Sequence, residues 1–412
     1  QFNPEEIAYL ESLGLFRRDF LDWLLDFRFT GDIDAPEEGT PVFGNQPLLT
    51  VRAPLAQAQL VETLLLNIIN FQTLVATKAA RIVRAAGGAP VLEFGLRRAQ
   101  GPNGAMSVAR AACIGGVRST SNVLAGKVFN LPVKGTHAHS WVMAFDSELE
   151  AFRAYARSFP DHCILLVDTV DTLKSGLPNA ITVAKELRQQ GHELFGIRLD
   201  SGDLAWLSRQ ARRMLDEAGF PEVRIVASNE LDEEVIHTIR DEGGCIDIYG
   251  VGTRLATCAG EGGGALGGVY KLVAIDEKPK MKLTADMAKA TLPGAKTVWR
   301  LVRPDGSYLQ DVITIAGEEP QPGETVYDPV NPAHFRVLDE PFEARPLAKL
   351  RMKGGKATDP APSLDELADR CQSELDRLPE GTLRLTNPHR YKVSISTSLH
   401  QLREELRRSM MR

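Results

Sequence analysis

The sequence is poor in cysteine and has no excess of basic charge. Its 412 residues include five cysteines, an odd number with no CxxC pair, which is typical of a reduced cytoplasmic protein and not of a disulfide framework. Lysine and arginine number 48 against 54 aspartates and glutamates, and the formal net charge is −6. This balance gives no general basic surface for nucleic acid, so any phosphate site must be local.

Long, purely apolar runs are also missing. The most apolar helix-like stretch, residues 60–77, contains Glu62, Asn67, Asn70 and Gln72. It therefore predicts a buried amphipathic helix and not a membrane span. The first residues show no signal-peptide pattern. We expect a cytoplasmic protein that binds neither nucleic acid nor a membrane.

Residues 88–268 alternate between short apolar runs, polar tips and helical stretches. The runs are rich in β-branched residues, four to six residues long and apolar on both faces, as in "CILLVD", "FGIRLD" and "VRIVAS". This pattern is typical of parallel strands covered by helices. Six such alternations predict an α/β fold with an irregular TIM-like barrel over 88–268, and a doubly wound sheet is the alternative.

The flanking segments predict a second region. Residues 1–87 and 269–355 read as short strands and helices that form one α/β sandwich built from both ends of the chain. Two antiparallel strand pairs are expected, one within 267–284 and one within 296–315, the latter joined by an Asp305-Gly306 turn. Residues 356–412 read as a C-terminal helical extension. A chain of this length is expected to need more than one domain.

Polar side chains stand at the carboxyl end of almost every predicted strand of 88–268. In a parallel barrel the reactive groups gather at those ends. The pattern therefore favours an active site there. Its candidate residues are Phe94, Arg97, Arg98, Thr136, His137, His139, Asp168, Asp171, Arg198, Asp200, Ser201, Gly202, Asp203, Ser228, Asn229, Glu230, Gly250, Gly252 and Thr253.

The pair His137 and His139 could be metal ligands, catalytic groups or ordinary polar residues. A metal pair would need further histidines or carboxylates grouped as ligands. The other histidines do not supply them: His162 and His192 precede strands, at the wrong end, and the rest lie in a helix or outside the predicted barrel. No direct metal-ligand motif is present.

Arginines and glycines at the strand ends suggest a local anion site. "GVGTR" follows a predicted strand, so backbone N–H groups and the Thr253 hydroxyl could face an anion. Arg97, Arg98 and Arg198 could bind phosphate or carboxylate. Asp200 and Asp203 could hold Mg²⁺ or ribose hydroxyls. Alternatively, "RLDSGD" is a solvated turn with a helix N-cap, and "EFGLRR" a strand followed by surface charges.

The motifs "EFGLRRAQGP", "SNVLAG", "KGTHAHSW", "GIRLDSGDL", "SNELDE", "GVGTRLAT" and "GGVYKLV" occur together in this order. With them the chain resembles the nicotinate phosphoribosyltransferase family. The resemblance implies an irregular barrel plus a sandwich, and a homodimer with shared active sites. It also implies the first step of NAD salvage from nicotinate. Nicotinate and phosphoribosyl pyrophosphate (PRPP) give nicotinate mononucleotide and pyrophosphate, with Mg²⁺ as cofactor and coupled hydrolysis of the co-substrate ATP.

The resemblance also assigns roles to individual residues. In "GTxxHS" the last histidine, here His139, is phosphorylated by ATP, whereas His137 falls at a variable position and reads as structural. A neutral imidazole is nucleophilic near pH 7, which suits this chemistry. The remaining roles are nicotinate binding by Thr136, Arg198 and Phe94; phosphate, PRPP or ATP binding by Arg97, Asn229, Gly252 and Thr253; and contact with ribose or Mg²⁺ by the catalytic Asp200.

One family motif is not found. The family carries a Thr-Asp-Leu-Tyr motif near its N-terminus, whose tyrosine contacts nicotinate from the partner subunit, and residues 1–30 do not match it. Tyr9 lies in a different segment, "EEIAYLES". Because the sequence begins with Gln and in mid-helix pattern, we expect that a preceding segment is missing from this chain.

Three alternative functions were considered. A quinolinate phosphoribosyltransferase needs no ATP and leaves "GTHAHS" unexplained. A nicotinamide phosphoribosyltransferase needs a hydrogen-bond acceptor where Thr136 stands. A non-catalytic PRPP- or nucleotide-sensing protein has no need of a phospho-acceptor such as His139.

Overall fold

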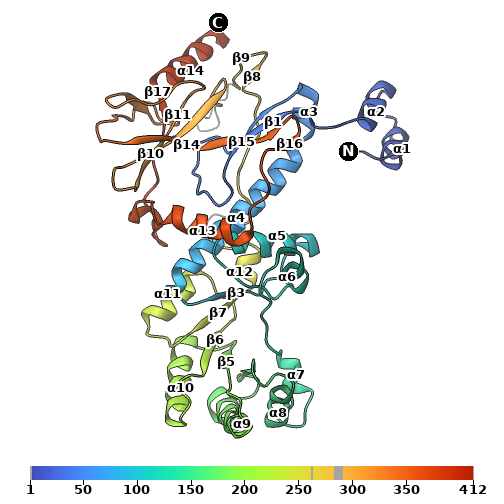
Figure 1. Cartoon of the computed structure of the whole chain (residues 1–412), viewed down its shortest axis with the longest axis vertical. Helices are drawn as coiled ribbons and strands as arrows, with labels where there is room; N and C mark the ends of the chain where they lie inside the picture. The colour runs from blue at the N-terminus through green and yellow to red at the C-terminus, as the bar shows by residue number, and fades with distance from the viewer. Residues whose placement is uncertain (1, 261–262, 283–290, 412) are drawn as a thin grey trace.

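A computed structural model of the chain describes residues 2–260, 263–282 and 291–411. Residues 261–262 of the predicted barrel segment and 283–290 of the predicted returning strands lie outside the described residues. Figure 1 shows an elongated molecule with antiparallel sheets at one end, a helix-covered parallel sheet at the other and long helices between them.

The parallel sheet has the strand order β3-β7-β6-β5-β4, and every neighbouring pair runs parallel. This confirms the predicted parallel strands. The strands are β3 (Val91–Glu93), β4 (Ile164–Leu166), β5 (Gly196–Leu199), β6 (Arg224–Ala227) and β7 (Ile248–Val251). Most of their residues are buried. One face packs against helices in a large core that includes Leu165 and Ile225, and on the other face Leu92, Val226 and Ile248 form a smaller apolar cluster.

Two single-residue bridges extend this sheet beyond β3: Glu93 pairs with Thr120, and Thr120 pairs with Val133, both parallel. The run "PVKGTHAHS", residues 132–140, is one of the alternations that predicted the barrel, but it forms only the bridge at Val133, and residues 134–138 lie in no strand. Instead, the Leu166 N–H of β4 donates to the His137 ring at 3.1 Å. The described pairings give an open sheet with these bridges, and the closed barrel remains a prediction.

Helices alternate with these strands and enclose a large apolar core that includes Val75, Phe152 and Ile225. Side-chain caps fix several helix starts, as Asp203 does for α10 and Asp232 for α11. The helices of this half are α5 (Gly101–Ile114), α6 (Val123–Phe129), α7 (His139–Met143), α8 (Glu148–Ser158), the π-helix η1 (Thr172–Gly176), α9 (Leu177–Gln189), α10 (Leu204–Glu217), α11 (Glu233–Asp241) and α12 (Thr253–Ala256).

The sheets at the other end of the molecule are antiparallel apart from one parallel pair, β11 with β17, and they combine distant parts of the chain. The first has the order β16-β15-β1-β2, and β1 pairs antiparallel with β15, so the two ends of the chain share this sheet. The second has the order β13-β12-β17-β11-β10-β14, and a small pair joins β8 to β9. The hairpin of β10 and β11 around Asp305-Gly306 confirms the predicted turn.

These strands are β1 (Asp32–Pro36), β2 (Thr50–Arg52), β8 (Ala274–Ile275), β9 (Lys278–Pro279), β10 (Lys296–Val302), β11 (Tyr308–Ile315), β12 (Thr325–Tyr327), β13 (Phe335–Val337), β14 (Glu343–Pro346), β15 (Ala348–Lys353), β16 (Lys356–Ala357) and β17 (Val393–Ser396).

The strand β17 was not predicted from the sequence. It lies between β12 and β11 in the middle of the six-stranded sheet, so residues 356–412 contain more than helices. Their other elements are α13 (Leu364–Leu375), the short 3₁₀ helix η3 (Glu380–Leu383) and α14 (Thr397–Met410). The domain limits themselves stay predictions.

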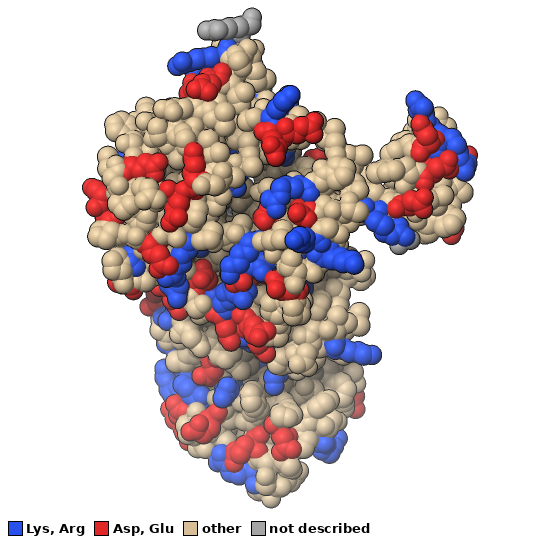
Figure 2. Space-filling model, turned by 45° about the horizontal axis from the view of Figure 1, so that its top comes forward, with Lys and Arg blue, Asp and Glu red and all other residues tan. Residues whose placement is uncertain are grey.

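The helix predicted over 60–77 is the start of α4 (Glu62–Ala86), which follows α3 (Leu55–Leu60) and runs from the antiparallel sheets to the parallel one (Figure 1). Its predicted burial is wrong for this part: Leu64 and Ile68 are 61% and 43% exposed, and within 60–77 only Val75 is buried. The helices α1 (Pro4–Ser12) and α2 (Arg18–Leu25) stand apart from the body, around a small core of their own. In the described parts of the chain no helix is both long and apolar enough to cross a membrane. Figure 2 shows acidic and basic side chains interspersed over the visible face.

Candidate active site

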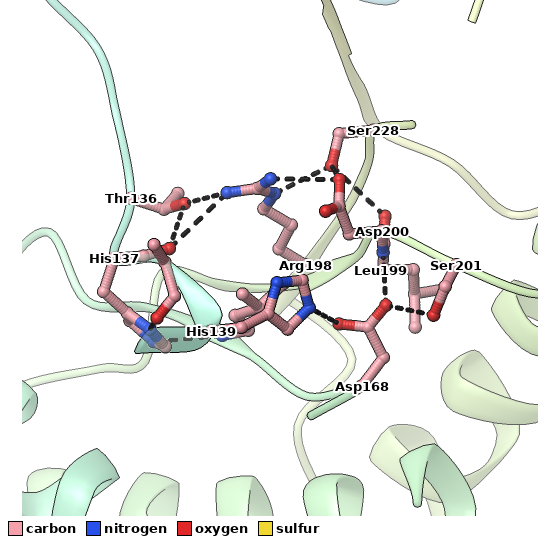
Figure 3. Close-up of polar contacts among 11 residues, drawn as sticks. Thr136, His137, His139, Asp168, Arg198, Leu199, Asp200, Ser201 and Ser228 are labelled. Atoms are coloured by element: carbon pink, nitrogen blue, oxygen red, sulfur yellow. Dashed lines mark hydrogen bonds and ion pairs between the residues drawn. The ribbon is translucent and has the colours of Figure 1, made fainter. Parts of the chain in front are cut away.

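The candidate site lies at the carboxyl ends of the parallel strands. β4, β5 and β6 run parallel and side by side, so the residues that follow them meet at one edge of the sheet. Figure 3 shows Asp168 after β4, Arg198 and Asp200 at the end of β5, and Ser228 after β6. The segment before α7 brings Thr136 and His137 to the same place, together with His139, the first residue of α7.

Arg198 is the centre of the first contact group. Its Nε donates to the Ser228 hydroxyl at 2.7 Å, and its Nη1 donates to the Thr136 hydroxyl at 2.7 Å. Its Nη2 donates to Asp200 Oδ1 at 3.0 Å, and the Ser228 hydroxyl donates to the same oxygen at 2.5 Å. The Arg198 and Asp200 side chains are 13% and 20% exposed, so this ion pair is largely shielded from water. The guanidinium is therefore held in one orientation by side chains from the loop before α7, from the end of β5 and from the end of β6.

Asp168 joins this group to His139. Its Oδ2 accepts the backbone N–H of Asp200 at 2.9 Å and the Ser201 hydroxyl at 2.6 Å. Its Oδ1 lies 3.1 Å from His139 Nε2. The Asp168 side chain is 1% exposed, whereas that of His139 is 40% exposed. A buried carboxylate thus fixes one ring nitrogen of a histidine that remains open to solvent.

His137 points away from this contact and has a different environment. Its ring packs edge-on against Tyr155, with 4.6 Å between the ring centroids, and the residue is 7% exposed. Nε2 accepts the Leu166 N–H, which leaves Nδ1 to carry the proton and face the Ala138 carbonyl at 3.4 Å. Burial lowers the pKa of His137 to about 4. The imidazole is therefore neutral and acts as an acceptor for β4.

Phe94 follows β3 and faces the same rim. Its ring lies 5.8 Å from the Arg198 guanidinium carbon. A Cβ at Gly250 would lie 2.8 Å from two atoms of the Phe94 ring, and a Cβ at Gly252 would lie 3.0 Å from the Phe94 carbonyl. Both glycines of "GVG" thus let the Phe94 turn approach β7 closely.

The residues predicted to bind phosphates are less closely connected. Arg97 and Asn229 are exposed, and Asn229 has a φ of 113°, a strained value for a side chain other than glycine. Thr253 donates to Glu230 at 3.1 Å. Among the described contacts none ties Arg97, Asn229, Gly252 or Thr253 to the Arg198 and His139 groups. Their role stays a prediction.

Two rim carboxylates serve as helix caps. Asp203 accepts the Trp206 N–H at the start of α10, and Asp171 accepts the N–H groups of Leu173 and Lys174 at the start of η1. Asp203 therefore follows the N-cap alternative considered for "RLDSGD". In the residues the structure describes, no group of three or more His, Cys, Asp or Glu side chains could hold a metal ion.

Sequence reasoning named Asp168 and Ser228 among the strand-end polar residues but gave them no role. The structure places both in direct contact with predicted site residues. Their signal was their position directly after β4 and β6, at the level of Arg198. The hydrogen-bond partners of these two side chains depend on distances across the sheet, and the sequence does not give those distances.

The chain is similar to proteins of known family. Three models of nicotinate phosphoribosyltransferase regions match the chain: the N-terminal domain at residues 1–70, the family model at 90–305 and the C-terminal domain at 295–403. Nicotinate phosphoribosyltransferase of Bacillus subtilis is 44% identical over 403 residues, which are 96% of this chain and 81% of that protein.

Two solved structures share the fold. The crystal structure of human nicotinic acid phosphoribosyltransferase is 33% identical with a TM-score of 0.87, and the match covers 98% of this chain and 89% of that one. The crystal structure of a nicotinate-nucleotide pyrophosphorylase from Pyrococcus furiosus is 25% identical with a TM-score of 0.70, covering 86% and 82%.

Proposed function

The chain belongs to the nicotinate phosphoribosyltransferase family and acts as a nicotinate phosphoribosyltransferase in NAD biosynthesis. Beyond this activity, we propose that it makes nicotinate mononucleotide and pyrophosphate from nicotinate and PRPP, and that ATP hydrolysis is coupled to the reaction through phosphorylated His139. The observation that carries the proposal is the continuous contact chain from Thr136 through Arg198, Asp200 and Asp168 to His139 (Figure 3).

Nicotinate would lie between Phe94 and the Thr136–Arg198 pair. The guanidinium lies beside the Phe94 ring, so a pyridine stacked on that ring would direct its carboxylate toward Arg198 and Thr136. A forked contact of guanidinium and carboxylate favours nicotinate over its amide. Asp200 already pairs with one side of the Arg198 guanidinium and so fixes its orientation toward the ligand.

His139 is the proposed phosphoryl acceptor. When Asp168 accepts a hydrogen bond from the Nε2–H group, the lone pair of the neutral ring resides on Nδ1. Among the described residues Nδ1 has no hydrogen-bond partner. Nδ1 attacks the γ-phosphorus of ATP, the new N–P bond forms, and the bond to the leaving ADP oxygen breaks. The positive charge that develops on the ring is stabilised by the buried Asp168 carboxylate.

Cleavage of PRPP requires stabilised charge more than acid or base groups. The C1–pyrophosphate bond breaks through a cationic, oxocarbenium-like state, and the pyridine nitrogen attacks C1 with its free lone pair. Asp200 would face the cationic sugar or the PRPP-bound Mg²⁺, consistent with the one or two carboxylates that commonly hold Mg²⁺ beside substrate phosphates. Bound Mg²⁺ would neutralise the departing pyrophosphate. Arg97, Asn229, Gly252 and Thr253 are the proposed phosphate contacts.

We also propose that the enzyme is a cytoplasmic homodimer with active sites shared between subunits, on an α/β barrel. All five cysteines lie in the described part of the chain and are unpaired, which supports a reducing compartment. The helix α6 exposes Val123, Leu124 and Val128 by 68%, 58% and 57%. Contiguous exposed apolar side chains of this kind are typical of interaction surfaces.

Product formation tests the proposal. The protein is incubated with PRPP and Mg²⁺ and with nicotinate, nicotinamide or quinolinate, each with and without ATP. We expect nicotinate mononucleotide, formed faster with ATP, and no acid-labile label from γ-labelled ATP in His139→Ala. Preference for nicotinamide or quinolinate would establish one of the alternative transferases, and binding without product from any base would establish a sensing protein.

A further inference from the structure

We propose that Glu93 is a positioning residue that fixes the two walls of the nicotinate pocket relative to each other, through a buried hydrogen bond to Thr120. The pocket itself rests on the function proposed above. Glu93 is the last residue of β3, directly before Phe94, and nothing in the reaction uses it as a reacting group. Glu93 and Thr120 are each 1% exposed.

The carboxylate of Glu93 contacts two segments, the turn after β3 and the segment around Thr120. One oxygen accepts the backbone N–H of Gly95, inside the turn that presents Phe94 and Arg97. The other oxygen accepts the Thr120 hydroxyl at 2.5 Å. In the described chain no basic side chain pairs with Glu93, so these two donors compensate its burial. Burial raises the pKa of the Glu93 carboxyl, and the two hydrogen bonds oppose that rise.

Thr120 is bonded in turn to the segment that leads to Thr136, which forms the other wall of the nicotinate pocket. Its N–H donates to the Pro132 carbonyl at 3.1 Å, and its carbonyl accepts the Lys134 N–H at 3.0 Å. Lys134 is two residues before Thr136. The Thr120 hydroxyl also accepts the Asn122 N–H at 2.9 Å. Residues 132–134 therefore connect to β3 through Thr120, by the two single-residue bridges. Two backbone hydrogen bonds, from the Glu93 N–H to Ser119 at 3.0 Å and from the Ser121 N–H to Glu93 at 2.9 Å, hold the Thr120 segment beside β3, and the side-chain contact adds to them.

The Phe94 turn has little freedom on its other side. A Cβ at Gly95 would lie 2.5 Å from the Ala256 Cβ and 2.9 Å from Glu93 Oε1. The turn is thus pressed between α12 and the Glu93 carboxylate. With the backbone bonds intact, loss of the Thr120 hydroxyl contact would let the Thr136 segment tilt against Phe94. Asp168, which follows β4 and accepts the Asp200 N–H, would keep its contact with His139 of α7.

The test compares Thr120→Val, which removes the hydroxyl at nearly constant volume, with Thr120→Ser, which keeps it. Thr120→Val should raise the KM for nicotinate on the order of tenfold to a hundredfold, since displacements of about 1 Å have such effects. The KM for PRPP and the labelling of His139 by ATP should change little. Thr120→Ser should behave as the unaltered protein does. Glu93→Gln, which keeps the Gly95 acceptor, should give a smaller rise, and the double variant should be less than additive.

A folded Thr120→Val with a nicotinate KM within about twofold of the unaltered protein, or with equal rises for nicotinate and PRPP, overturns the proposal. If Thr120→Val does not fold, Glu93→Gln is judged by the same two KM values. Failure of the unaltered protein to use nicotinate would instead overturn the proposed function.

Discussion

The imidazole Nε2 of His139 lies 3.1 Å from Oδ1 of Asp168, whose side chain is 1% exposed. This contact predicts that Asp168→Asn impairs phosphorylation of His139. An amide cannot stabilise the charged ring, and a hydrogen bond to a charged group contributes roughly 1.5–3 kcal/mol, about tenfold to a hundredfold in rate. Incorporation of label from γ-labelled ATP measures the loss.

Asp171→Asn is the matched control, because Asp171 follows the same strand but only caps η1, and asparagine caps helices equally well. It should retain the label. Full labelling of Asp168→Asn would remove Asp168 from the mechanism.

Arg198→Ala should weaken nicotinate binding more than PRPP binding. The substitution removes the guanidinium from Thr136 and Ser228 and leaves Asp200 unpaired. We expect the KM for nicotinate to rise on the order of tenfold or more. Arg224→Ala, at the opposite end of the neighbouring strand β6, is the control and should leave both KM values unchanged. A nicotinate KM that does not respond to Arg198→Ala would assign Arg198 to the phosphates or to structure alone.

His137 should make the fold sensitive to acid. Its pKa is lowered from 6.5 to about 4 by burial, so between these values the unfolded chain binds a proton that the folded one does not. The free energy of unfolding contributed by this group is therefore present above pH 6.5 and falls as the pH drops toward 4, by about 2 kcal/mol between pH 7 and pH 5.

His137→Gln keeps an acceptor for the Leu166 N–H but does not titrate. Urea unfolding at pH 7 and pH 5 should show a smaller loss of stability for the variant than for the unaltered protein. If both proteins lose the same free energy of unfolding between pH 7 and pH 5, His137 has the same pKa in the folded and the unfolded chain.

The exposed face of α6 should lie in the proposed dimer interface. Leu124→Glu or Val128→Glu would bury an unpaired carboxylate there, which costs several kcal/mol. The dissociation constant of the dimer should rise on the order of a hundredfold or more, with loss of activity at low protein concentration. Sedimentation measures the mass. Val235→Glu, on α11 and 39% exposed, is the control. A Leu124→Glu dimer as stable as the unaltered one would exclude α6 from the interface.

The sequence predicted those features that have a local signal. The parallel strands appear as short apolar runs, α4 as an amphipathic run, the β10–β11 hairpin through Asp305-Gly306, and the site through polar residues at strand ends. The strand β17 also has a local signal, the apolar–polar alternation of "YKVSIS", but its place between β12 and β11 depends on pairing with distant segments. Sheet closure is equally non-local: at β4 the described partner of the Leu166 N–H is a side chain and not a strand.

The same limit applies within the site. That Arg198 would be near Thr136 was implied by the resemblance, but its pairing with Asp200 and the link from the Asp200 N–H to Asp168 depend on geometry between β5 and β4. Glu93 shows the limit most clearly. In the sequence it is the last residue before a motif phenylalanine, and its partner Thr120 lies 27 residues away.

The hydrogen bond from the Asp200 N–H to Asp168 has a thermodynamic consequence. It makes the guanidinium of Arg198 and the imidazole of His139 parts of one assembly. If phosphorylation of His139 strengthens nicotinate binding by a given factor, bound nicotinate must favour phosphorylation of His139 by the same factor, because a coupling free energy between two sites is reciprocal. The base being salvaged would then regulate the loading of the phosphoryl group, and ATP would be used least when nicotinate is scarce.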